Sequence, residues 1–257
     1  MNILENNDTV KQQYATAAKL ENRISLHEKY STNKFGWFNW LYSNYDIKPG
    51  DRILELGCGN GKLWAEHYSD LPEHVSLILS DFSESMIKTA KELIGNESIS
   101  YQTIDVQDIP YPDGCFDIVI ANMMLYHVPD IEKGLLEIKR VLKCGGKFYA
   151  ATLGENGIAG FIRKALGLPK TDGMKFTLQN GTECLKPHFS RIEIKLYEDS
   201  LAVTDTNDLI SYIRTLMWTD ELQKIPDSVI FSMLEEHKKD GVITIPKEYG
   251  TFIAYNE

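Results

Sequence analysis

The sequence of 257 residues predicts an α/β domain built on a doubly wound, mostly parallel sheet. Two observations predict this fold class. From residue 52 onward, short apolar runs alternate with segments whose apolar residues recur at helical spacing. The first of these runs, Arg52–Leu56, passes directly into a turn of alternating glycines and then into a helical face. Strands that alternate with helices in this way pair in parallel, with helices on both faces of the sheet.

The glycine turn gives the clearest chemical signal. With glycine at 57, 59 and 61, the main chain can adopt positive φ, and no Cβ separates it from a ligand. A dinucleotide fold has G-x-G-x-x-G around a pyrophosphate, whereas this turn is G-x-G-x-G with Glu55 two residues before it. A carboxylate at this place repels a pyrophosphate and suits a cationic group. The spacing therefore disfavours a nicotinamide-dependent dehydrogenase.

Later strands of the predicted sheet also end at polar residues. The second strand, Leu77–Ser80, is followed by Asp81, about twenty residues beyond the glycine turn, where an acid can accept two hydrogen bonds from a ribose diol. Ser83 is predicted to cap the next helix, which disfavours a purely capping role for Asp81. The third strand leads into Asp105, and the fourth ends at Asn122.

These strand ends resemble the motifs of the class I S-adenosylmethionine-dependent methyltransferases, in particular their UbiE-like small-molecule group. The first family motif is an acid followed by G-x-G-x-G, as at 55–61, and the run 105–120 matches a family segment D-A-x-x-L-P-F, a turn and F-D-V-V. The resemblance covers 51–152. It implies a Rossmann-like seven-stranded sheet with an antiparallel C-terminal edge hairpin at 191–197 and 251–255. It also implies S-adenosylmethionine as the cofactor, with S-adenosylhomocysteine as the product.

The resemblance further implies roles for individual residues. Glu55 is expected to face the methionine amino group, with Gly57 to Gly59 under the adenosyl part. Asp105 is expected to accept from the adenine amino group, and the Val106 N–H to donate to a ring nitrogen. Val106 stands where the family usually has alanine, which narrows the expected adenine slot. The cofactor-binding candidates are Glu55, Gly57, Cys58, Gly59, Asp81, Phe82, Met86, Asp105, Val106 and Asn122.

His127 follows the fourth strand and is the histidine that this interpretation places at the mouth of the site. Histidine titrates near neutral pH, so it can take a proton from an incoming hydroxyl or amine. The alternative is a structural role, because the resembling family often keeps a histidine here whatever its substrate. His127 is thus the catalytic candidate. The predicted reaction is methylation of a small molecule, with oxygen or nitrogen favoured over carbon.

Helical segments surround the predicted sheet in the sequence. Residues 1–46 are predicted to form a helical lid, and 47–257 the cofactor-binding domain with a helical insertion at about 200–240. The stretch 23–37 combines aromatic bodies with polar tips, as pocket walls do. Packing onto the sheet explains each single aromatic better, so both interpretations stay open for the segment. The substrate-binding candidates are Tyr14, Arg23, His27, Tyr30 and Trp37.

Composition bounds the possible partners. The formal net charge is −10, with acids spread throughout, which argues against nucleic acid as a partner. The four cysteines lack C-x-x-C spacing, so the sequence indicates neither a metal site nor a disulfide framework. No apolar run approaches membrane-spanning length and no signal segment is evident. We therefore expect a cytoplasmic protein without a membrane partner, as a monomer or homodimer.

Two alternatives to a small-molecule methyltransferase remain open at this stage. The protein could bind an adenosyl ligand without catalysis, because an intact cofactor site does not require an active acceptor site. It could also methylate tRNA or protein, although the acidic charge and the lack of an appended binding module disfavour this.

Overall fold

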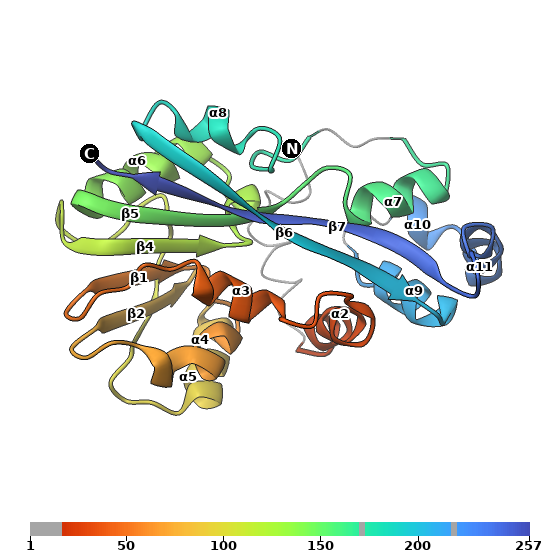
Figure 1. Cartoon of the computed structure of the whole chain (residues 1–257), viewed down its shortest axis with the longest axis horizontal. Helices are drawn as coiled ribbons and strands as arrows, with labels where there is room; N and C mark the ends of the chain where they lie inside the picture. Colours follow the sequence, from red (N-terminus) through yellow and green to blue (C-terminus); the bar gives the residue numbers. More distant parts are fainter. Residues whose placement is uncertain (1–16, 170–172, 217–219) are drawn as a thin grey trace. The chain divides into compact units, whose positions relative to one another are not determined.

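The computed structural model describes residues 17–169, 173–216 and 220–257. Within these residues, seven strands form one sheet in the order β3-β2-β1-β4-β5-β7-β6 (Figure 1). The strands β1 to β5 run parallel, and β7 and β6 complete the sheet in antiparallel fashion. The predicted seven-stranded sheet with an antiparallel C-terminal edge is therefore confirmed. The strands are β1 (Arg52–Leu56), β2 (Ser76–Asp81), β3 (Ser100–Thr103), β4 (Phe116–Asn122), β5 (Leu142–Leu153), β6 (Arg191–Val203) and β7 (Ile243–Tyr255).

The chain divides into two compact units. Unit 1 contains the helices α2 (Ala17–Tyr30), α7 (Ile158–Ala165), α9 (Thr206–Ile213), α10 (Asp220–Gln223) and α11 (Asp227–Glu235), together with parts of β6 and β7. Unit 2 contains β1 to β4 and nearly all of β5, with the remaining parts of β6 and β7. The predicted domain boundary at residue 46 and the lid role of the N-terminal helices stay predictions. Unit 1 comprises Met1–Lys34, Leu153–Met174 and Glu198–Tyr249, and unit 2 comprises Phe35–Thr152, Lys175–Tyr197 and Gly250–Glu257.

In unit 2, helices cover both faces of the sheet. Successive residues of β1 point to opposite faces, so Leu54 joins one apolar cluster and Ile53 the other. A parallel strand buried on both faces is apolar throughout, which is why β1 is recognisable in the sequence. The helices α6 (Ile131–Val141) and α8 (Gly181–Leu185) contribute to the first cluster, and α3 (Trp37–Ser43), α4 (Lys62–His67) and α5 (Glu84–Ile94) to the second.

Unit 1 has its own apolar core. Leu26 of α2, Ile162 of α7 and Leu209 of α9 pack there with Leu234 of α11 and Ile245 of β7. All five side chains are buried. The unit can therefore be described as a separate hydrophobic core that the antiparallel strands enter.

The helix α6 ends at Val141, and Gly145 already lies in β5, where its N–H donates to the Asn256 carbonyl at 2.6 Å. The predicted bounds of the last two strands are wrong. Both β6 and β7 are 13 residues long and exceed the predicted 191–197 and 251–255. Within the predicted helical insertion at about 200–240 the structure has α9, which ends at Ile213, α10 and α11.

Candidate functional site

The turn after β1 holds its three glycines at positive φ, 70° at Gly57, 57° at Gly59 and 75° at Gly61. A Cβ on Gly57 would lie 2.8 Å from the Met124 side chain, and one on Gly61 would lie 2.9 Å from Cβ of Ala90. A Cβ on Gly59 would meet no atom within 4 Å. At Gly57 and Gly61, the missing Cβ therefore makes room for neighbouring side chains. The open side of Gly59 is where a ligand can approach the main chain.

Glu55 lies near the carboxyl end of β1 and is 3% exposed. Its carboxylate accepts hydrogen bonds from the indole N–H of Trp64 and, at 3.0 Å, from the amide nitrogen of Asn122. Both donors are neutral. Burial raises the pKa of Glu55 to about 7; the two hydrogen bonds lower it, and the nearby Asp81 charge raises it further. In the part of the chain that the structure describes, the carboxylate therefore has no cation among its partners, and a cationic ligand group would stabilise its charge.

Two residues of the Glu55 network, Trp64 and Tyr45, are not among the site residues predicted from the sequence. The amide nitrogen of Asn122 also donates to the Tyr45 hydroxyl at 2.9 Å. The available signal was the polar atom on each ring, which needs a partner when the ring is buried. Which partner it finds depends on packing between β1, β4 and the helices, and no local pattern records that.

Asp81 connects the glycine turn to the start of α5. Its carboxylate accepts from the Gly59 N–H at 3.0 Å and from the Ser83 N–H at 2.8 Å. Ser83 occupies the N-cap position but its side chain makes no capping hydrogen bond, so the predicted Ser83 cap is wrong. Burial raises the pKa of Asp81, although both N–H donors oppose this. A carboxylate can accept about four hydrogen bonds, so acceptor capacity remains for a ligand.

Asp105 and Val106 follow β3. The Asp105 carboxylate accepts from the main-chain N–H of Gln107 at 2.9 Å and from the Gln107 side-chain amide at 3.1 Å. The two methyl groups that distinguish Val106 from alanine lie against Gly134 of α6, where a Cβ would be 3.4 Å from the nearer one. The Val106 side chain is buried there. Its extra volume is therefore accommodated by a glycine on the facing helix.

The remaining cofactor candidates, Cys58, Phe82 and Met86, follow the ends of β1 and β2. Cys58 is half-buried, and its N–H donates to the Ser80 carbonyl at 2.8 Å. Burial raises the pKa of its thiol well above the ordinary value, so the thiol stays protonated. Phe82 is half-buried directly after β2, and Met86 is buried in the first turn of α5. The structure thus brings the candidates of β1 and β2 to adjacent, parallel strand ends.

The chain turns sharply where β4 ends. Met123 has φ of 55°, which is unfavourable for a residue with a side chain, and its N–H donates to the Ala151 carbonyl at 2.8 Å. Strain of this kind accumulates at functional sites. The 3-10 turn η3 (Leu125–His127) follows, and His127 is half-buried with its ring centroid 4.5 Å from that of Tyr126. The structure therefore places His127 one short turn beyond the end of β4.

The substrate candidates fall in different units. In unit 2, the Trp37 ring stacks on Trp40 with centroids 5.3 Å apart and meets the Tyr197 ring edge-on at 5.2 Å. In unit 1, the Tyr30 hydroxyl donates to Asp208 at 2.6 Å. Tyr14 lies outside the described residues. Arg23 lies in α2, but its side chain is outside the described part.

His27 of unit 1 has a buried Nδ1 without a hydrogen-bond partner among the described residues. Its ring lies 6.0 Å from the Tyr212 ring and 6.1 Å from the Tyr249 ring, centroid to centroid. Burial and the nearby Lys247 charge lower the pKa of His27 to about 3, although Asp199 opposes this. His27 is therefore a neutral side chain with a buried ring nitrogen in an aromatic setting.

The described residues offer little for other kinds of site. In the part of the chain that the structure describes, no group of three or more His, Cys, Asp or Glu side chains could hold a metal ion. The described helices include none long and apolar enough to cross a membrane. The cysteines at 58, 115, 144 and 184 are free thiols. The strand-end cluster of unit 2 is consequently the site on which a functional argument can be built.

Comparisons with known proteins bear on this cluster. A family model described as a methyltransferase domain matches residues 54–150. Over 117 residues the chain is 32% identical to the ubiquinone/menaquinone biosynthesis C-methyltransferase UbiE of Vibrio vulnificus. That match covers 43% of this chain and 44% of the relative, so less than half of the relative's length is represented. The matched region contains the glycine turn and the ends of β2 and β4.

Two solved structures share the fold. The YcgJ protein of Bacillus subtilis has a TM-score of 0.61 at 15% identity, over 86% of this chain and 97% of its own. Phosphoethanolamine N-methyltransferase 2 of Haemonchus contortus, solved in complex with S-adenosyl-L-methionine, has a TM-score of 0.59 at 17% identity, over 98% of this chain and 59% of its own. At these identities the likeness shows the fold alone.

Proposed function

We propose that the protein, which matches a methyltransferase domain over residues 54–150, transfers a methyl group from S-adenosylmethionine to a small-molecule acceptor. One observation carries the proposal. Carboxylates stand at the ends of three neighbouring parallel strands, Glu55 on β1, Asp81 on β2 and Asp105 after β3. In such sheets the carboxyl ends of the strands are where ligands bind.

Each of these residues has a distinct proposed task. Glu55 and Asn122 hold the cationic methionine end, because Glu55 is a buried carboxylate with neutral partners. Asp81 accepts from the ribose diol with the capacity that its two N–H donors leave. Asp105 and the Val106 N–H bind the adenine edge, with Phe82 and Met86 against its faces. Gly59 and the neighbouring Cys58 main chain line the open side of the turn.

The bound cofactor supplies an electrophilic methyl group whose leaving thioether needs no acid. The chain's remaining tasks are to align the acceptor and to remove at most one proton from it. We propose oxygen or nitrogen as the accepting atom and His127 as the group that takes the proton. Among the substrate candidates, Trp37 is the one that we assign to the acceptor, because it belongs to unit 2, as the proposed cofactor residues do.

The atom that receives the methyl group can be identified in the product by NMR. The Vibrio relative is named as a C-methyltransferase, and that activity is the relative's own. With a ¹³C-labelled methyl donor, the chemical shift of the transferred carbon separates O-, N- and C-methyl products. A carbon-bound product would overturn our choice of atom while leaving methyl transfer intact. A His127→Gln variant with an undiminished transfer rate would remove the proposed role of His127.

The proposal is tested first by calorimetric titration with S-adenosylmethionine, S-adenosylhomocysteine and NADH. We expect the two adenosyl ligands to bind and NADH not to bind. Asp81→Asn should weaken adenosyl binding by about 1.5–3 kcal/mol, because a charge-assisted hydrogen bond is lost. Asp117→Asn is the matched control, because Asp117 also accepts a main-chain N–H, from Arg52 at 2.9 Å, but at the amino end of β4. Equal effects of the two substitutions, or binding of NADH alone, would refute the site.

A further inference from the structure

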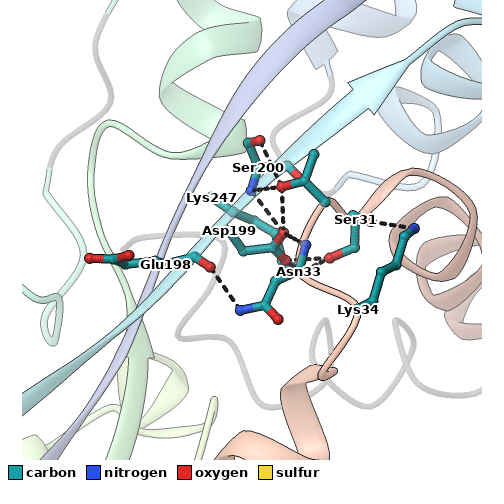
Figure 2. Close-up of polar contacts among 8 residues, drawn as sticks. Ser31, Asn33, Lys34, Glu198, Asp199, Ser200 and Lys247 are labelled. Atoms are coloured by element: carbon teal, nitrogen blue, oxygen red, sulfur yellow. Dashed lines mark hydrogen bonds and ion pairs between the residues drawn. The ribbon is translucent and has the colours of Figure 1, made fainter.

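The strand β6 forms one edge of the sheet, and its second half is covered (Figure 1). There the Thr32 N–H donates to the Ser200 carbonyl at 2.9 Å, and the Asn33 side-chain amide donates to the Glu198 carbonyl at 2.9 Å. Figure 2 shows how this covering segment is fixed in unit 1. Asp199 accepts from the Asn33 N–H at 2.9 Å and from the buried Lys247 ammonium at 2.6 Å.

The first half of β6 is not covered in this way. Among the described residues, no strand and no isolated bridge pairs with its outer edge from Arg191 to Leu196. Ile194 is 45% exposed and Leu196 is 63% exposed. An exposed apolar edge strand is a template for pairing with another chain, and proteins commonly cover or blunt such edges. The opposite edge of the sheet, β3, is protected differently, because it has only four residues, Ser-Tyr-Gln-Thr.

The covered half of β6 shows which main-chain N–H and C=O groups point away from the sheet in the open half. The carbonyls of Glu198 and Ser200 point outward, since residues 32 and 33 bind them. Main-chain groups alternate in direction along a strand, so those of Ile192, Ile194 and Leu196 point outward as well. The outward-pointing groups of the open half therefore belong to its three apolar residues.

We propose that this open half of β6 pairs in antiparallel fashion with β6 of a second copy of the chain, about a two-fold axis at Ile194. In this register Ile192 lies opposite Leu196 of the partner subunit. On the other face, Glu193 lies opposite Lys195 of the partner subunit, and the symmetry makes the same pair twice. An interface on a two-fold axis must be self-complementary. This strand meets the condition, because apolar residues lie opposite apolar residues and Glu193 lies opposite a lysine.

Charge also disfavours the two adjacent registers. Moving the axis by one residue toward the N-terminus would set Glu193 opposite Glu193 of the partner subunit, and moving it the other way would oppose two copies of Lys195. Like charges directly opposite one another destabilise a strand pair. The apolar face of the open half is continuous with the core of unit 2, because Ile192 packs against the core cluster to which α6 and α8 contribute. Pairing would extend this core across the axis.

A strand pair of this length buries less surface than a standard interface of roughly 1,600 Å², so we expect a reversible dimer with a dissociation constant in the micromolar range. The proposal does not depend on methyl transfer, since none of these residues is among the cofactor candidates. Sedimentation equilibrium of the full chain, from low micromolar to millimolar concentration, measures the constant.

Charge exchange at the two positions is the decisive experiment. Lys195→Glu should raise the dissociation constant at least about tenfold, because four carboxylates then face one another in two pairs. The double variant Glu193→Lys with Lys195→Glu should restore dimerisation, because the pairs are again of opposite sign. Leu196→Lys is a second disrupting variant, at a position exposed enough to leave folding intact.

The outcomes separate this interface from others. A wild-type protein that stays monomeric at millimolar concentration would overturn the proposal. So would a dimer that survives both Lys195→Glu and Leu196→Lys, or a double variant that stays as weak as the single one. Titration with S-adenosylhomocysteine on each variant reports on unit 2 independently, so a failure of the dimer is distinguishable from a failure of the proposed function.

Discussion

Both units of the protein bury a carboxylate, and the two carboxylates have different partners. In unit 2, Glu55 accepts from two neutral donors, the Trp64 indole and the Asn122 amide. In unit 1, Asp199 accepts from the Lys247 ammonium at 2.6 Å and from the Ser31 hydroxyl. The side chains of Lys247 and Asp199 are 3% and 0% exposed. Among the described residues, one buried charge is compensated by a cation and the other is not.

The pKa values record this difference. Burial acts to raise the pKa of both carboxyl groups. At Asp199 the hydrogen bonds from Lys247, Ser31 and the Asn33 N–H outweigh burial, and the pKa is lowered. At Glu55 the neutral donors do not outweigh burial, and the pKa rises to about 7. A buried acid with its own cation is a structural pair, whereas a buried acid without one is a candidate for binding a cationic ligand.

The largest test of this comparison breaks the compensated pair. Lys247→Met keeps most of the side-chain length but leaves Asp199 buried without its cation. We expect the free energy of unfolding to fall by about 3–5 kcal/mol, as when one partner of a buried ion pair is removed. Denaturant titration at neutral pH measures the change. Lys143→Met is a matched control, because the ion pair of Lys143 with Asp117 is partly exposed, with Lys143 at 45%, and it should cost no more than about 1 kcal/mol.

A second substitution shows whether the cost comes from the unpaired charge. Adding Asp199→Asn to Lys247→Met removes that charge, and the amide oxygen can still accept from the Asn33 N–H. The double variant should be more stable than Lys247→Met alone. If it were equally or less stable, the ion pair would not be what stabilises this part of unit 1.

The second prediction concerns the uncompensated acid. Glu55→Gln removes the charge and keeps the size. The pKa of Glu55 is raised from 4.5 to about 7, so the folded protein binds the proton more tightly than the unfolded chain. Stability from this group is therefore fully present below pH 4.5 and is lost as the pH rises through 7. At about 1.4 kcal/mol per pKa unit, the loss amounts to roughly 3 kcal/mol.

We expect Glu55→Gln to be more stable than the wild type above pH 7, by up to about 3 kcal/mol. Gln can accept from the Trp64 indole and can donate to Asn122 once that amide turns over. The same variant should bind S-adenosylmethionine more weakly, because the ammonium loses its carboxylate. Denaturant titrations at several pH values, paired with calorimetry, measure both effects. A variant that is destabilised above pH 7 would contradict the assignment of an uncompensated charge.

The comparison also explains what the sequence could predict. The strands of unit 2 are continuous apolar runs, and the glycines after β1 mark a turn, so local patterns were sufficient for β1, β2 and β4. Asp81 and Glu55 could be placed together because parallel strands bring their carboxyl ends to one edge. The Trp64 donor to Glu55 and the contact of Tyr45 with Asn122 could not be predicted, since both depend on tertiary packing.

The extent of the last two strands was missed for a related reason. The side chains of Asp199 in β6 and Lys247 in β7 are buried, at positions where the alternating pattern expects apolar residues. Each charge interrupts the pattern unless its partner is known, and the two lie 48 residues apart in the sequence. A buried ion pair therefore concealed the strands that it stabilises.

The smallest predicted effect sharpens the account of Glu55. Trp64→Phe removes the indole donor, which should raise the pKa of Glu55 further, because one of its two hydrogen bonds is lost. The smaller ring also leaves a cavity, but the cost of a cavity does not depend on pH. The difference in destabilisation between pH 8 and pH 5 therefore isolates the hydrogen bond to the charged form, and we expect it to be about 1–2 kcal/mol. Equal destabilisation at the two pH values would mean that the indole does not support the carboxylate. In the background of Glu55→Gln the pH-dependent part should vanish, because position 55 then carries no charge at either pH.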